Sequence, residues 1–217
     1  MAVSAGSCLL LQFAREPVVG AVKTRMMPEL SASEACELHC ELVLWTSDSL
    51  LAAGLGPVEM VVAGAVEHPL FVRCRDRGLA GIGRQRGEGL GERMYHALAG
   101  GLLRYERVIL VGSDCPGIDR QYLHSAVMAL DSTEVVLGPA LDGGYVLVGA
   151  RGINQGMFEG IVWGSDTVMA STRERLRQLA VKWTELPPLA DIDRPEDLPV
   201  WQALRQAWWG RQGVLRR

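Results

Sequence analysis

Four apolar residues at positions 108–111 are followed at once by the sequence GSDCP at 112–116. A short, uninterrupted apolar run is typical of a strand buried on both faces of a parallel sheet. Asp114 then comes just beyond the carboxyl end of that strand, where open α/β sheets bind their ligands. A carboxylate there is placed to hold a divalent metal, and the metal in turn a phosphate. The alternative is that Asp114 caps the next helix, although Asp119 is the better candidate for that cap.

The remainder of the chain alternates strand and helix signals. Buried strands are predicted at 8–13, 58–63, 107–112, 134–137 and 143–148, with weaker ones at 81–85 and 182–186. Helices are predicted over 31–53, 68–78, 90–102, 119–130, 167–180 and 195–209, the first of them opened by a capping box of Ser31 and Glu34. This alternation predicts an α/β protein with three layers, α/β/α, and a mainly parallel sheet. The strand at 143–148 follows its neighbour through a tight turn, which predicts a mixed sheet.

Length and composition limit the alternatives. We find no linker or internal repeat in the 217 residues, so we expect a single domain over 1–217 with a basic tail at about 210–217. The apolar content of 48% predicts a real core, and the net charge of -3 gives no support for nucleic-acid binding. No apolar run is long enough for a membrane span, and no signal peptide is recognised. The five scattered cysteines favour reduced thiols, and we expect a cytoplasmic protein.

The loop after the first strand carries three cations: Arg15, Lys23 and Arg25, with Gly20 at its bend. Lysine occurs only twice among the 22 basic residues, so a lysine here is informative, because a compact point charge suits a phosphate. The spacing is not that of a Walker loop. The loop therefore predicts either a polyphosphate site or an ordinary solvated basic loop.

A second carboxylate for a metal is available in the sequence ADIDRPED at 190–197. Asp191 and Asp193 are two residues apart, so in an extended loop they face the same way. Mg²⁺ usually takes one or two carboxylates together with phosphates and water. One of these residues can complete the site; alternatively, Asp193 is the N-cap of the last helix, beside Pro195.

The sequence GPALDGGY at 138–145 places two glycines after Asp142. Gly143 and Gly144 permit positive φ and the close approach of another molecule. A plain hairpin turn explains them nearly as well. The segment also follows a predicted strand, so all four motifs are expected beside the same edge of the sheet.

Taken in order, these motifs resemble small bacterial glycosyltransferase-like proteins of the nucleotide-diphospho-sugar transferase fold (GT-A type, Rossmann-like). That family was once catalogued as a domain of unknown function and is now often named after arsenosugar-biosynthesis glycosyltransferases. The matching segments lie between residue 8 and about residue 200: FAREP with GxVKTR at 13–25, Gln85 with GLGERM at 89–94, 112–116, 137–145, 163–168 and 191–197.

The resemblance implies a role for each matching position. It implies Mg²⁺ or Mn²⁺ at Asp114, with Asp193 as the second ligand. Asp142 is the candidate to orient or deprotonate an acceptor hydroxyl, and Lys23 is the candidate to share the charge of the leaving diphosphate. Nucleotide binding falls on Phe13, Arg15, Gly20, Lys23, Thr24, Arg25, Gln85, Gly89, Gly91 and Arg93, and the acceptor side on Gly143, Gly144, Tyr145 and Trp163.

Two positions depart from the expected pattern: Arg15 replaces a lysine, and Gly164 replaces a small hydroxyl residue after Trp163.

From the motifs and the resemblance together, we expect a metal-dependent enzyme that transfers a sugar from a nucleoside-diphosphate sugar to an acceptor. The first alternative is a nucleotidyltransferase, similar to the guanylyltransferases of molybdopterin and phospholactate, which uses a nucleoside triphosphate and a phosphorylated acceptor. The second alternative is a nucleotide-binding module without catalysis.

Overall fold

A seven-stranded sheet forms the centre of the molecule. The computed structural model describes the backbone of residues 8–214 and the side chains of residues 8–206. The strand order is β3-β2-β1-β4-β6-β5-β7. All neighbouring strands are parallel except β6, which is antiparallel to both β4 and β5. The predicted mainly parallel, mixed sheet is therefore confirmed. The strands are β1 (Cys8–Arg15), β2 (Val58–Ala63), β3 (Gly81–Arg84), β4 (Arg107–Val111), β5 (Val135–Pro139), β6 (Tyr145–Ala150) and β7 (Trp183–Glu185).

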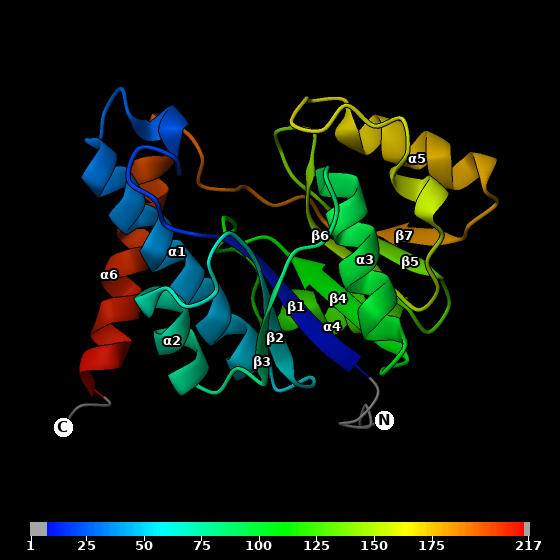
Figure 1. Cartoon of the computed structure of the whole chain (residues 1–217), viewed down its shortest axis with the longest axis horizontal. Coiled ribbons are helices and arrows are strands. Elements are labelled where there is room, and N and C mark those ends of the chain that lie inside the picture. Colours follow the sequence, from blue (N-terminus) through cyan, green and yellow to red (C-terminus); the bar gives the residue numbers. More distant parts are fainter. Residues whose placement is uncertain (1–7, 215–217) are drawn as a thin grey trace.

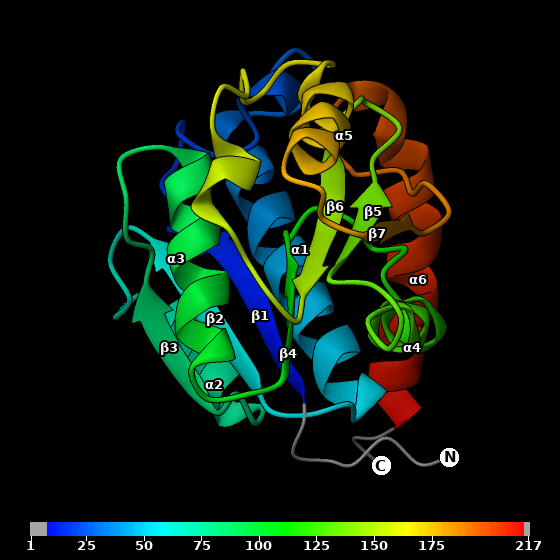
Figure 2. The ribbon, with the colours of Figure 1, turned by 90° about the vertical axis from the view of Figure 1, so that its right-hand side faces the viewer.

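Helices cover both faces of the sheet, so the three predicted layers are confirmed (Figures 1 and 2). One face carries α1 (Ala32–Ala53), α2 (Pro69–Asp76), α4 (Arg120–Ala129) and α6 (Leu198–Val214). The other face carries α3 (Leu90–Leu102), α5 (Val168–Gln178) and the short 3-10 helix η2 (Gln155–Phe158). Two further 3-10 helices, η1 (Thr24–Met26) and η3 (Pro195–Asp197), precede α1 and α6.

The central strands are buried on both sides and feed two separate cores. In β1, Leu10 packs under α1, whereas Leu9 and Leu11 face α3. The same alternation in β4 places Ile109 on the α1 side. Because both faces are apolar, the strands appear in the sequence as unbroken hydrophobic runs, and for that reason they were predictable.

The predicted helix starts are confirmed at two caps. Ser31 and Glu34 form the expected capping box of α1, and the Asp119 side chain accepts the backbone N–H of Tyr122 at the start of α4. Because Asp119 caps α4, the carboxylate of Asp114 is not the cap of this helix.

The last predicted helix differs in two respects. It opens with the 3-10 turn η3, and α6 begins only at Leu198. Its backbone stays helical to Val214, so most of the segment predicted as a tail continues the helix; residues 215–217 lie outside the described part. Trp201 anchors α6: it is 2% exposed and lies edge-on to Trp45, with the ring centroids 5.5 Å apart. Within the described residues no helix is long and apolar enough to cross a bilayer.

The strand order also determines where a ligand can bind. From β1 the sheet continues to β2 on one side and to β4 on the other. Connections that leave neighbouring strands in opposite directions open a crevice beyond their carboxyl ends. This crevice lies between the ends of β1 and β4.

Candidate functional site

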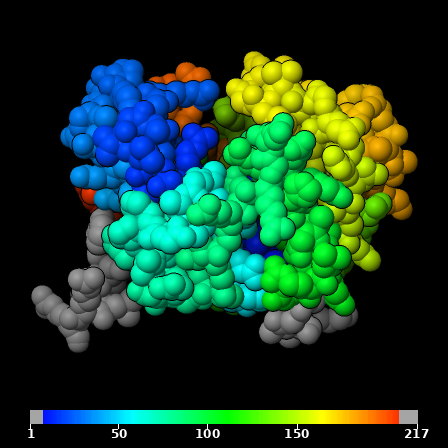
Figure 3. Space-filling view, in the orientation of Figure 1, coloured from blue at the N-terminus to red at the C-terminus, as the bar shows by residue number. Residues whose placement is uncertain are grey.

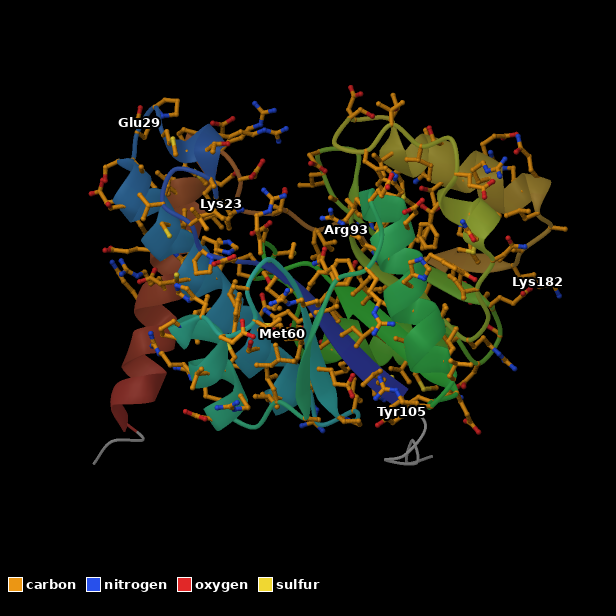
Figure 4. The ribbon with its side chains drawn as sticks, viewed as in Figure 1. Lys23, Glu29, Met60, Arg93, Tyr105 and Lys182 are labelled. Carbon is orange, nitrogen blue, oxygen red and sulfur yellow. The ribbon has the colours of Figure 1, made fainter. Side chains whose placement is uncertain are left out.

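A cavity of about 550 Å³ occupies this crevice. Its floor is the ends of β1 and β4, and its walls come from the loop before η1, the start of α3 and the start of β6. In Figure 4, Lys23 lies on the α1 side of the opening and Arg93 on the α3 side. Segments far apart in the sequence therefore meet at one place, as expected from the motifs.

Lys23 is the buried cation of this cavity. Its side chain is 3% exposed, and its ammonium lies 2.8 Å from Asp114 Oδ1 and 3.5 Å from Asp193 Oδ1. The ammonium also donates a hydrogen bond of 2.6 Å to the backbone carbonyl of Ile192. Lys23 has a left-handed backbone, with φ of 50° and ψ of 38°. Such a conformation is strained for a residue with a side chain and is often found at functional sites.

Asp114 presents one oxygen to Lys23 and leaves the other toward the cavity. Oδ1 is buried and accepts no well-directed hydrogen bond, whereas the side chain as a whole is 47% exposed. Burial is the largest single influence and raises the pKa of Asp114, but the charge and the hydrogen bond of the Lys23 ammonium, with a smaller contribution from Arg15, together hold the pKa below its usual value. The carboxylate is therefore ionised and has a free oxygen for a ligand.

Asp193 faces the cavity and does not cap the last helix. The carboxylate of Asp197 caps η3 instead, accepting the backbone N–H groups of Asp193 and Arg194 at 2.9 and 2.7 Å. Asp193 Oδ2 lies 2.7 Å from a guanidinium nitrogen of Arg25. The alternative that made Asp193 an N-cap is therefore wrong.

Asp191 does not line the cavity, although it is only two residues from Asp193. Its pKa is raised, first by burial and then by the negative charges of Asp142 and Asp193. The two carboxylates of the ADID sequence thus have different surroundings, and only Asp193 lines the cavity.

A buried polar network supports the end of β4 and was missed by sequence reasoning. Gln12, fully buried in β1, donates to Ser113 Oγ at 3.0 Å and accepts from Ser47 Oγ at 2.7 Å. Ser113 donates to the carbonyl of Phe13 at 2.7 Å. These bonds tie α1, β1 and β4 together immediately before Asp114. A glutamine inside an apolar run was the available signal, because a buried amide needs partners.

His39 of α1 also lines the cavity and was not predicted. Its Nε2 donates to the carbonyl of Arg15 at 2.9 Å. Burial lowers its pKa, so the ring is neutral at pH 7. Burial also raises the pKa of Cys115 to about 12, so the thiol of the GSDCP sequence stays protonated, and it donates to the carbonyl of Ala190.

Gln85, just after β3, and Arg93, in the first turn of α3, each contribute a side chain to the cavity. Gln85 Nε2 donates to the carbonyl of Val61, and Arg93 donates to the carbonyls of Gly87 and Glu88. The first bond holds Gln85 against β2, and the other two hold the loop at 87–88 against the start of α3. No carboxylate neutralises Arg93 within the described side chains, so its charge remains available to a ligand.

Gly91 serves packing. A Cβ at this position would lie 3.0 Å from atoms of Phe158 and Trp163. Trp163 does not line the cavity; its ring packs edge-on against Tyr145, with the centroids 6.1 Å apart, and only Tyr145 reaches the lining. Burial raises the pKa of Tyr145, so its hydroxyl is neutral.

The first of the paired glycines accommodates the protein's own backbone. Gly143 has φ of +94°, and a Cβ there would lie 2.1 Å from the carbonyl oxygen of Asp166. Asp142 is exposed, and its Oδ1 accepts the N–H of Gly144 at 2.9 Å. The close approach predicted from the sequence is therefore made by the loop before α5.

The structure brings most of the predicted site residues together. The cavity is lined by Phe13, Arg15, Lys23, Thr24, Arg25, Gln85, Arg93, Asp114, Tyr145 and Asp193. Outside the lining are Gly20, Gly89, Gly91, Asp142, Gly143, Gly144 and Trp163. Within residues 8–206, no three acidic, histidine or cysteine side chains converge as a metal cluster.

Comparisons with known proteins agree with this architecture. The model of a family of uncharacterized proteins conserved in bacteria (DUF2064) matches residues 46–165, and the chain belongs to that family. No curated protein sequence matches the chain. A crystal structure from Desulfovibrio desulfuricans G20, provisionally named a nucleotide-diphospho-sugar transferase, is 29% identical and superposes with a TM-score of 0.76, covering 86% of this chain and 82% of that one.

More distant structures share the fold alone. A 4-diphosphocytidyl-2C-methyl-D-erythritol synthase from Anaerococcus prevotii is 10% identical, with a TM-score of 0.63 over 94% of this chain and 100% of that one. Rv0371c from Mycobacterium tuberculosis, solved in complex with manganese, is 16% identical, with a TM-score of 0.52 over 88% and 93% of the two chains. The predicted nucleotide-diphospho-sugar transferase fold is thus confirmed.

Proposed function

We propose that this protein transfers a sugar from a nucleoside-diphosphate sugar to an acceptor, with the diphosphate held between the carboxyl ends of β1 and β4. The observation that carries the proposal is the buried ammonium of Lys23, which lies in the cavity beside two carboxylates. The name given to the Desulfovibrio relative supports the same class of substrate.

The charges of the lining suit a diphosphate. Arg15, Lys23, Arg25 and Arg93 line the cavity, against the carboxylates of Asp114 and Asp193. The cations exceed the acids, so the cavity attracts a polyanion. Lys23 and Arg25 lie nearest the acids and are the residues that we expect to stabilise the charge that develops as the glycosidic C–O bond breaks.

We propose Asp114 and Asp193 as ligands of a divalent metal, Mg²⁺ or Mn²⁺. The fit rests on the free oxygen of Asp114 and on the Asp193 side chain, which is 29% exposed. Two carboxylates are a usual protein contribution to a Mg²⁺ site, the other ligands being phosphate oxygens and water. When bound, the metal would neutralise charge on the diphosphate leaving group. Because no third acid converges there among residues 8–206, we expect tight metal binding only with the nucleotide present.

The acceptor side of the proposal is the turn between β5 and β6. Tyr145 reaches the cavity, and Asp142 lies three residues before it in the same turn. Asp142 holds the turn by accepting from Gly144, and a carboxylate at this rim is available to orient an acceptor hydroxyl. Trp163, which lies outside the cavity lining, would hold the ring of Tyr145 in place through their edge-on contact.

The second candidate function is nucleotidyl transfer from a nucleoside triphosphate. Four cations around one cavity also suit a triphosphate, and this observation keeps the alternative open. The products separate the two reactions: sugar transfer releases a nucleoside diphosphate, whereas nucleotidyl transfer releases pyrophosphate. A nucleotide-binding module without catalysis would release neither while still binding the nucleotide.

The test is a set of UDP-, GDP-, ADP- and CMP-sugars, and of the corresponding triphosphates with sugar phosphates, each with and without Mn²⁺. Binding is measured by calorimetry, and release of nucleoside diphosphate or pyrophosphate by chromatography. In Lys23→Ala we expect the affinity for a nucleoside diphosphate to fall more than the affinity for the bare nucleoside. Equal losses for both would instead indicate that Lys23 serves only the folding of its loop.

A further inference from the structure

A second hollow lies on the α3 side of the sheet, below the cavity already described. It has a volume of about 200 Å³ and runs between α3 and the strands β2 and β3. Figure 3 shows it as a depression between the residues of α2 and β3 on one side and those of α3 on the other, with atoms of β1 and β2 at its floor. We call it the α3 groove.

The α3 groove exists because α3 lies close over β1 and β4 and leaves β2 and β3 uncovered. A Cβ at Gly101 would lie 2.7 Å from Val108 and 3.1 Å from Leu9, so only glycine allows the helix to approach these strands. The floor of the groove is made by Leu11 and Val61. Gly100 also lines the groove and has open space where a side chain would be.

The walls of the α3 groove are strongly basic. Among the described residues, they carry four arginines and one histidine against a single acid, Glu59. The basic residues are Arg84, Arg86, Arg93, His96 and Arg104. Such a concentration stands out in a protein whose net charge is -3.

Two of these cations are already paired with acids. Arg104 makes two bonds to Glu59, of 2.7 and 2.9 Å, and this pair lies at the far end of α3 from Arg93. Arg84 has only an exposed contact of 3.8 Å with Glu67.

Among the side chains of residues 8–206, the other two guanidinium groups meet no carboxylate. Arg93 donates to the backbone carbonyls of Gly87 and Glu88, and Arg86 has no hydrogen bond or ion pair within residues 8–206. The nearby carboxylate of Glu92, in α3, accepts the N–H of Glu88 in the preceding loop. Unneutralised guanidinium groups beside an apolar floor favour an anion with planar or tetrahedral oxygens, which they bind through paired hydrogen bonds.

We propose that the α3 groove is a second ligand site, which binds a phosphate or carboxylate group between Arg86 and Arg93. Arg93 lines both the groove and the larger cavity, so the two sites are adjacent. An elongated anionic ligand can therefore lie along α3 beside the bound nucleotide. The anion site stands without the proposed function; only this relation to a nucleotide rests on it.

The experiment is a titration of the ¹⁵N-labelled protein with inorganic phosphate and, separately, with citrate, at constant ionic strength. The backbone amides of Gly83 and Gly100 report on the groove, and those of Gly112 and Ser113 report on the cavity. We expect saturable shifts at Gly83 and Gly100. Saturation by phosphate alone identifies a phosphorylated ligand, and saturation by citrate alone identifies a carboxylate.

Variants assign the shifts to the groove. Arg86→Gln should raise the dissociation constant for the anion, as reported by Gly83 and Gly100, by about tenfold or more, because it removes a charged hydrogen-bond donor. Arg75→Gln, which removes an exposed arginine of α2, is the charge-matched control and should leave this dissociation constant unchanged. Lys23→Met should remove only the shifts at Gly112 and Ser113 and leave those at Gly83 and Gly100.

Other outcomes would overturn the proposal. Shifts confined to Gly112 and Ser113, or shifts that never saturate, mean that the groove is an ordinary basic surface. Retention of the wild-type dissociation constant in Arg86→Gln has the same meaning. If nucleotides leave Gly112 and Ser113 unmoved while phosphate still saturates Gly83 and Gly100, the proposed function fails and the anion site remains.

Discussion

Replacing Lys23 by methionine tests the central electrostatic feature of the site. Methionine keeps most of the volume of the lysine stem and removes the ammonium. The change leaves Asp114 Oδ1, which is buried 2.8 Å from the ammonium, without a counter-charge. It also leaves the carbonyl of Ile192 without its donor.

The cost follows from the burial of each partner. Removing one member of a buried ion pair typically costs about 3–5 kcal/mol, because the other charge stays buried and unpaired. Here the Asp114 side chain is 47% exposed, so water compensates part of the loss. We therefore expect the free energy of unfolding at pH 7 to fall by about 1–2 kcal/mol. For a chain of this size, that corresponds to roughly 2–8 °C in Tm.

The pH dependence has a definite sign. In the wild type Lys23 holds the pKa of Asp114 below its unfolded value. That interaction stabilises the fold above the unfolded pKa, and the contribution is lost as the pH falls through the folded pKa. In Lys23→Met burial is left to raise the pKa of Asp114, so the carboxylate destabilises the fold at neutral pH and the cost disappears on acidification. The gap between wild type and variant should thus be widest at pH 7 and should narrow toward pH 4.

Urea unfolding at several pH values measures this gap. Lys182→Met removes the other lysine of the chain, which is exposed and distant from the site, and serves as the control (Figure 4). The double variant Lys23→Met with Asp114→Asn should be more stable at pH 7 than Lys23→Met alone, because it no longer buries an unpaired charge. An unchanged free energy of unfolding, or a gap that does not depend on pH, would refute the reasoning.

Two further predictions concern the carboxylates of the ADID sequence and the glycine turn after β5. Asp193→Asn should lower the Mn²⁺-dependent affinity for a nucleoside diphosphate about tenfold, whereas Asp191→Asn should leave the Mn²⁺ titration unchanged; a normal titration for Asp193→Asn contradicts the metal proposal. Gly143→Ala should lower the free energy of unfolding by about 1–3 kcal/mol, because the new Cβ meets the carbonyl of Asp166 at positive φ. Gly100→Ala, with open space in a helix, is its control and should be neutral or slightly stabilising in thermal unfolding.

The elements of the fold were predictable because their signals are local. The buried face of α1 repeats through Leu38, Leu42 and Trp45, and the buried strands are continuous apolar runs. The helix η2 was not predicted, since a 3-10 helix of four residues has no periodicity to read. Local patterns also located the cavity, because every parallel strand ends at the same edge of the sheet.

Side-chain pairing within the cavity was not predictable in the same way. Lys23 and Asp193 are 170 positions apart, and only the sheet brings them together. The sequence could not decide whether Asp193 is a cap or a site residue, because both roles need the same extended backbone before Pro195. His39 was missed because a single histidine on a mostly apolar helix face has no local signal that separates a packed residue from a cavity residue.

The position of Asp193 yields one more prediction, since the structure shows what holds it. Ile192 N–H donates to the carbonyl of Asp114 at 2.8 Å, and Asp197 accepts from the N–H groups of Asp193 and Arg194. Asp197 therefore acts as a positioning residue for Asp193. Its side chain holds the backbone of Asp193 and does not contact the Asp193 carboxylate.

Asp197→Ala should release these two N–H groups and let Asp193 move from its place beside Arg25 and Lys23. We expect a loss of about 1 kcal/mol in stability, which is typical of a lost helix cap. A purely structural cap would change only that quantity. If Asp197 positions Asp193, the Mn²⁺ concentration for half-maximal binding of a nucleoside diphosphate must also rise, whereas Glu196→Ala, at the exposed neighbouring position, leaves it unchanged. A lower Tm for Asp197→Ala with an unaltered Mn²⁺ titration would show that the carboxylate of Asp193 is held by Arg25 and Lys23 alone.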